Sequence, residues 1–152
     1  MTKFEILQIF TGFIGSLGFA ILFNIRGKRL ITVAIGGLFS WLLFVVISKC
    51  VTSEPIVYFI IACVISIYAE IMARVLKTPT TTFITTSLVP LIPGGSLYYT
   101  MTFAFQGNLN TFLPKAIYTM QLASALALGI IVSTTFARVF NKVIINKIKN
   151  KI

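Results

Sequence analysis

Apolar runs of about 20 residues alternate with short polar stretches along the chain. A bilayer core about 30 Å thick needs about 20 apolar residues to be crossed by an α-helix. The pattern therefore predicts an all-α integral membrane protein, a single transmembrane domain over residues 1–152. Five transmembrane helices are expected, at about residues 4–23, 30–48, 55–74, 80–106 and 115–137, followed by a basic tail, 138–152.

The fourth run, Thr80–Gln106, carries Pro-Leu-Ile-Pro-Gly-Gly near its centre. Each proline removes a backbone donor and clashes with the preceding turn, so Pro90 and Pro93 predict a helix broken between about Val89 and Gly95. Broken backbone at membrane depth persists only where protein buries it or where it lines a polar cavity.

The break is a candidate binding site. A helix that restarts at Gly94 or Gly95 directs free N–H groups toward the gap, and that positive end suits a carboxylate. The hydroxyls of Ser96, Tyr98 and Tyr99 follow within the next turn and a half. The alternative is a kink that is simply packed within the protein.

Composition agrees with a membrane protein: 57% of residues are apolar and only 11% are charged, against about 25% in soluble domains. The net charge of +10 does not indicate nucleic-acid binding, because the basic residues lie in short clusters between apolar runs. Such clusters mark cytoplasmic loops, and the tail is expected either to reinforce this topology or to touch anionic lipid. The clusters are Arg26, Lys28 and Arg29; Arg74 and Lys77; and the tail from Arg138 onward.

These clusters alternate with ends that are poor in basic residues. The alternation predicts a multi-pass protein of the cell membrane, with the N-terminus outside and the C-terminus in the cytoplasm.

Glu70 is the one acid well inside a predicted span. Arg74 lies four residues later on the same helix face and can pair with it. Glu70 therefore either relays protons or meets a substrate ammonium, as intramembrane carboxylates often do, or it only neutralises Arg74.

Small residues recur at four-residue spacing in three of the predicted helices, which favours close helix packing. The contacts could lie within the chain or with another subunit. The stripes are Gly12, Ser16, Ala20 and Asn24; Gly36, Gly37 and Ser40; and Ala125, Gly129, Ser133 and Ala137. A threonine-rich stretch, residues 78–87, either lines a path or bonds its own backbone.

Other chemistries find no support. The chain has no His and no Asp, and Cys50 and Cys63 suggest small buried thiols, so no metal, no cofactor and no catalytic residue is predicted.

The run Tyr68–Pro79, then Phe83, Val89–Gly95 and Tyr98, resembles the threonine/serine exporter family, and so does Gly18–Asn24 in the first helix. The likeness is to the small membrane subunit of the split, two-gene members. It implies proton-driven export of threonine and serine, or of dicarboxylates such as succinate. It also implies a larger partner subunit with a cytoplasmic domain.

The expected ligand is thus a small carboxylate-bearing substrate. A membrane scaffold or assembly partner that does not transport is the alternative, and it would need neither an intramembrane carboxylate nor a broken helix. The candidate substrate and coupling residues are Asn24, Glu70, Arg74, Pro90, Pro93, Gly94, Gly95, Ser96, Tyr98 and Tyr99.

Overall fold

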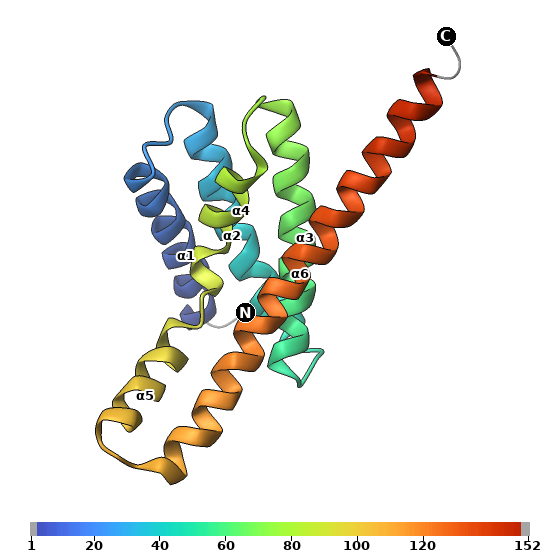
Figure 1. Ribbon diagram of the computed structural model, residues 1–152. Coiled ribbons are helices and arrows are strands. Elements are labelled where there is room, and N and C mark those ends of the chain that lie inside the picture. Colours follow the sequence, from blue (N-terminus) through green and yellow to red (C-terminus); the bar gives the residue numbers. More distant parts are fainter. Residues whose placement is uncertain (1–2, 150–152) are drawn as a thin grey trace.

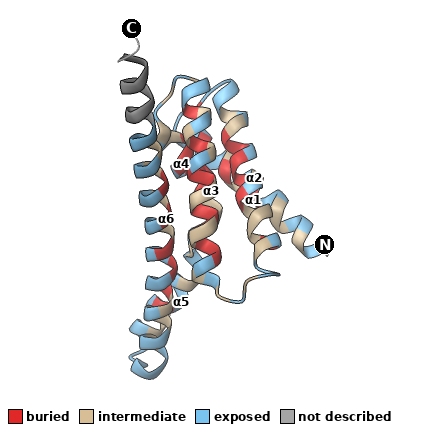
Figure 2. Ribbon diagram, turned by 90° about the vertical axis from the view of Figure 1, so that its right-hand side faces the viewer, coloured by how far each residue is buried: buried red, intermediate tan, exposed pale blue. Residues whose placement is uncertain are grey.

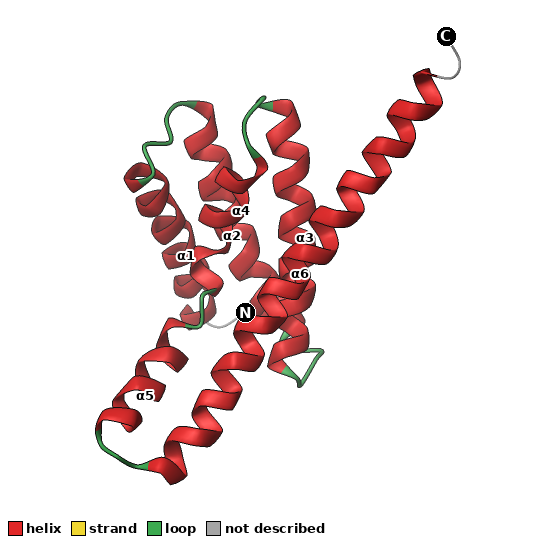
Figure 3. Cartoon of the chain, in the orientation of Figure 1, coloured by secondary structure: helices red, strands yellow, loops and turns green. Residues whose placement is uncertain are grey.

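The computed structural model describes residues 3–149, with side chains described as far as Phe140. Within that range the chain is all-helical, with short turns between the helices (Figure 3). The elements are α1 (Lys3–Leu22), α2 (Lys28–Ile47), α3 (Glu54–Val75), α4 (Thr80–Leu88), the 3-10 turn η1 (Val89–Leu91), α5 (Gly94–Phe105) and α6 (Leu109–Lys149).

Helix lengths match a bilayer for the first three helices. α1, α2 and α3 contain 20, 20 and 22 residues, about 30 Å each at 1.5 Å per residue. In the described part of the chain, four helices are long and apolar enough to cross a membrane: these three and Leu109–Phe140 of α6. α4 and α5, with 9 and 12 residues, are each too short, so the predicted fourth span corresponds to two short helices.

In Figure 1, α1, α3 and α6 run upward and α2, α4 and α5 run downward, with α1 against α2, and α4 against α2 and α3. α6 runs in the same direction as α3 and packs across it at an angle (Figure 1). The core lies where α1 to α4 meet (Figure 2). Phe83 of α4 and Ile61 and Ile65 of α3 are its largest fully buried side chains.

The small-residue stripes are packing surfaces within this chain. Gly12, Ser16 and Ala20 are the buried residues of α1. At Gly129 of α6, an added Cβ would lie 2.6 Å from Ala62 Cβ and 2.7 Å from the Phe59 carbonyl oxygen of α3. Only glycine permits this approach, so close intramolecular packing, one of the two predicted alternatives, accounts for these stripes.

The last helix differs from the prediction of a span over 115–137 that follows a polar turn at 107–110. α6 begins at Leu109, includes Pro114, and continues through most of the predicted tail. Pro114 lies in the second turn, where it removes the helical hydrogen bond to the Asn110 carbonyl. Gly107, with φ of 67°, makes the turn after α5. The lysines of the tail lie outside the residues whose side chains are described.

The two ends of the bundle differ in charge. The α1–α2 and α3–α4 turns lie at one end, together with the C-terminal part of α6 (Figure 1), and we call this the basic end. At the opposite end Lys49 Nζ lies 2.9 Å from Glu5 Oε1, and Tyr118 donates to Glu54. The hairpin of α5 and the start of α6 extends past this end of α1, α2 and α3 (Figures 1 and 2).

Candidate functional site

Glu70 lies near the basic end of α3 and has two partners. Arg74 Nη2 lies 2.9 Å from Glu70 Oε1, as the four-residue spacing predicted. Thr80 Oγ1 donates to Glu70 Oε2 at 3.0 Å. Thr80 is the first residue of α4, whose N-terminus attracts negative charge. Glu70 therefore ties α3 to the start of α4 as well as balancing Arg74.

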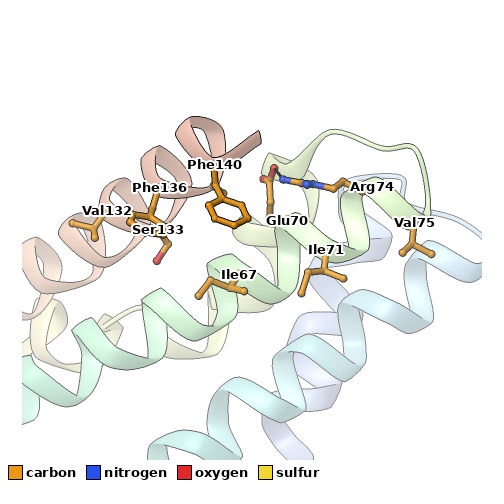
Figure 4. A pocket seen from close by; sticks show the side chains of 10 residues that line it. Ile67, Glu70, Ile71, Arg74, Val75, Val132, Ser133, Phe136 and Phe140 are labelled. Atoms are coloured by element: carbon orange, nitrogen blue, oxygen red, sulfur yellow. Dashed lines mark hydrogen bonds and ion pairs between the residues drawn. The ribbon is translucent and has the colours of Figure 1, made fainter. Parts of the chain in front are cut away.

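Glu70 and Arg74 also end a groove of about 640 Å³ between α3 and α6. Figure 4 shows the pair pointing toward one another, with Phe140 projecting from α6 toward Glu70. Apart from this pair, Ser133 is the polar residue of the lining, and its hydroxyl donates to the Cys63 carbonyl oxygen rather than facing the groove. The rest of the lining is apolar. Nothing in the sequence indicated the α6 wall of this groove, because the pairing of α3 with α6 is not local. The remaining lining residues are Ile67, Ile71, Val75, Val132, Phe136 and Ala137.

The Pro-Gly segment lies toward the opposite end of the bundle. α4 ends at Leu88, and η1 contains Pro90. The helix restarts at Gly94, with Pro93 as its N-cap residue. A Cβ added at Gly94 or at Gly95 would meet no described atom within 4 Å. Packing within this chain therefore does not explain either glycine.

The hydroxyls after the break do not converge on Glu70. Ser96 Oγ accepts from Thr119 Oγ1 of α6 at 3.0 Å, which joins α5 to α6. The rings of Tyr98 and Tyr99 are both more than half exposed and meet edge to face at 5.5 Å. Asn24, with φ of 57°, forms the turn after α1 and accepts from Arg26 Nε at 2.9 Å.

The structure thus brings Glu70 and Arg74 together at one end of the bundle and Pro90, Pro93 and Gly94 together toward the other. It does not combine the two sets into one site. Sequence reasoning also missed Trp41, whose Nε1 is buried without a hydrogen-bond partner among the described residues. The one feature of the sequence that could have indicated Trp41 is the polar ring nitrogen that it places within an apolar run.

The described residues form an all-helical bundle with four helices long and apolar enough to cross a membrane, as in a polytopic membrane protein. The chain matches the family described as Threonine/Serine exporter, ThrE, over residues 8–136. It belongs to this exporter family. Comparison with curated proteins and with solved structures yields no match.

Proposed function

We propose that the chain is the small membrane subunit of a two-component exporter, which uses the proton gradient to move threonine and serine, or dicarboxylates such as succinate. The family match over residues 8–136 carries this proposal. The substrates share a carboxylate and are small. The larger subunit would supply a cytoplasmic domain.

The α5–α6 hairpin supports a partner subunit. The tip of the hairpin lies beyond the polar pairs Glu5–Lys49 and Glu54–Tyr118, which mark where a bilayer around α1 to α3 would end. Acyl chains would therefore not cover the apolar side chains of the tip, and burial against protein would stabilise them. Between the contacting residues Thr100 and Thr119, the large apolar side chains that are more than half exposed are Met101, Phe105, Leu109, Leu113 and Ile117.

The predicted fourth span would correspond to α4, η1 and α5 in series, of which α4 and η1 lie at the depth of α1 to α3 and α5 continues beyond it. Half-helices at membrane depth are a recurring device in secondary transporters, because their exposed backbone groups bind substrate. In this scheme Glu70 carries the coupling proton or meets the substrate ammonium.

A membrane scaffold without transport is the second candidate. The two partners of Glu70 favour it, because a fully paired carboxylate can serve a structural role alone. Reconstitution separates the two functions. Liposomes holding both subunits should release threonine, serine or succinate when a proton gradient is applied, and liposomes holding this chain alone should release none.

Release by the chain alone would contradict the two-component proposal. Absence of release from the two subunits together, with both shown to be inserted and folded, would favour the scaffold. Liposomes that contain the larger subunit alone are the matched control, because they show whether this chain is needed.

A further inference from the structure

The helices α1 and α4 meet along a seam, backed by α2, that holds a recess toward each end. The recess toward the basic end has a volume of about 250 Å³ and lies between Phe23 and Ile25 on one side and the threonines of α4 on the other. The recess toward the opposite end has a volume of about 190 Å³ and lies between α1, Trp41 and Pro90. Because α1 and α4 run in opposite directions, the end of α1 lies beside α4 and the first half of α1 lies beside Pro90. The two recesses therefore follow one another along the same seam.

Between the recesses, two buried serines lie without hydrogen-bond partners among the described residues. They are Ser16 of α1 and Ser87 of α4, each 0% exposed. Other hydroxyls nearby donate to their own helix: Ser40 donates to the Gly37 carbonyl at 2.8 Å and Thr86 to the Thr82 carbonyl at 2.6 Å. A buried hydroxyl without a partner costs free energy, so alanine would suit a purely structural seam better.

Two adjacent glycines of α2 make room for these serines. A Cβ on Gly36 would lie 2.2 Å from Ser87 Oγ, and a Cβ on Gly37 would lie 1.8 Å from Ser16 Oγ. Both serines therefore face α2, at the back of the seam, and each lies beside a residue that lines a recess, Gly15 or Thr86.

The recesses carry matching polar groups. In the basic-end recess, Thr85 and Thr86 donate to backbone carbonyls and keep their oxygen lone pairs as acceptors. In the other recess, lined also by Gln8 and Thr11, the buried Nε1 of Trp41 is a donor that has no partner among the described residues. Acceptors suit an ammonium or a hydroxyl, and donors suit a carboxylate. The two volumes correspond to about eight and six waters of ~30 Å³ each, which is room for a small amino acid.

We propose that this seam is the substrate path, and that a small carboxylate-bearing solute passes from the threonine recess, past Ser87 and Ser16, to the recess at Trp41 and Pro90. The inference rests on the proposed function. The larger groove between α3 and α6 is not the path, because its lining is almost entirely apolar. The contacts of Ser16 and Ser87 with Gly37 and Gly36 close the path in this structure. Passage therefore requires α1 and α4 to move away from α2 at these two contacts.

Two glycines of α1 provide a matched test. Gly15 lines the recess at Trp41 and Gly18 does not, and a Cβ on either would meet no described atom within 4 Å. In the two-subunit complex, Gly15→Leu should lower export of threonine, serine or succinate about tenfold or more, with a melting temperature that is the same or higher. Gly18→Leu should export within about twofold of the unmodified protein. Equal export by the two variants would overturn the path.

The serines give a second measurement. Ser87→Ala should lower export about tenfold while the melting temperature stays the same or rises, because the substitution removes an unpaired buried hydroxyl. Ser40→Ala, which removes a paired hydroxyl outside both recesses, should leave export unchanged. Normal export by Ser87→Ala would contradict a substrate contact there.

Labelling separates failure of the path from failure of the function. In a Cys50→Ser, Cys63→Ser background, Thr82→Cys and Thr11→Cys should each react with a water-soluble thiol reagent, from opposite sides of the membrane, and threonine, serine or succinate should slow both reactions. If the unmodified complex exports none of these, the proposed function fails and labelling alone decides the path. Lack of reaction at either cysteine would then overturn it.

Discussion

At the scale of single residues, the two partners of Glu70 set what its replacement should do. The side chain is 20% exposed and that of Arg74 is 51% exposed. Solvent screens such a pair, so its contribution to stability is at most about 1 kcal/mol. A Gln at this position keeps an oxygen that can accept from Thr80.

Glu70→Gln should therefore insert and fold nearly normally, with a loss of about 1 kcal/mol or less. If the carboxylate carries the coupling proton, export by the Glu70→Gln complex should fall to background. A separate variant in which Glu70 and Arg74 exchange places should also fail to export, because its carboxylate is displaced by four residues. Export and melting temperature measured on the same preparation check this. Glu54→Gln, which removes the acid bonded to Tyr118 at the other end, is the control. Near-normal export by Glu70→Gln, with an unchanged pH dependence, would exclude the coupling role.

Gly129 and Gly18 should respond to alanine with opposite signs. Gly129→Ala places a methyl group 2.6 Å from Ala62 Cβ, and overpacking of this kind costs about 1–3 kcal/mol. Gly18→Ala meets nothing within 4 Å and should gain about 0.5–1 kcal/mol, because alanine favours the helix. Thermal unfolding in detergent measures both. A shift of the same sign in both variants would refute the close α3–α6 contact.

At the scale of elements, the interruption after Leu88 lets α4 and α5 pack against different helices. α4 packs within the bundle, whereas α5 packs on α6. Polar contacts join the hairpin: Thr119 donates to Ser96, and Thr100 and Thr119 lie 3.0 Å apart through their Oγ1 atoms. The direction of α5 thus depends on the break and on these hydroxyls together.

A cysteine pair tests that dependence. In the background that lacks native cysteines, Ser96→Cys with Thr119→Cys should form a disulfide under mild oxidation, because the two oxygens are 3.0 Å apart. Leu97→Cys with Met120→Cys, two exposed positions on the same helices, is the control and should cross-link poorly. Adding Pro90→Ala and Pro93→Ala favours a continuous helix by about 3 kcal/mol per proline and should lower the yield. An unchanged yield would show that the prolines do not set the direction of α5.

At the scale of the whole molecule, the arrangement of the ends agrees with the charge pattern. The α1–α2 and α3–α4 turns carry the basic clusters and are separated along the chain by α2 and α3. Both turns lie at the same end of the bundle (Figure 1). Basic clusters face the cytoplasm in most membrane proteins. A cytoplasmic basic end would leave the α5–α6 hairpin on the outer side.

Labelling of intact cells checks this orientation. In the cysteine-free background, Asn108→Cys, in the α5–α6 turn, should react with a membrane-impermeant reagent. Lys77→Cys, in the α3–α4 turn, should react only after the cells are opened. The opposite result would place the basic end outside.

Much of the helical framework was predictable from the sequence. The all-helical architecture is confirmed, and α1, α2 and α3 begin and end within two residues of the predicted spans. The Glu70–Arg74 pair was also predictable, because residues four apart share a helix face. The start and end of α6 were missed because Pro114 and the polar tail suggest helix boundaries, whereas a proline in the second turn removes only one hydrogen bond.

The sequence by itself determined the class of protein, the lengths of its first helices and the interruption of the fourth segment. These features are local, since a helix in a bilayer satisfies its own hydrogen bonds and needs only enough apolar residues to cross. Tertiary structure alone decided that α3 pairs with α6, that Ser16 and Ser87 meet adjacent glycines of α2, and that the Glu70 pair lies away from the break. These contacts join residues far apart in sequence, and they depend on how small residues let particular helix faces approach one another.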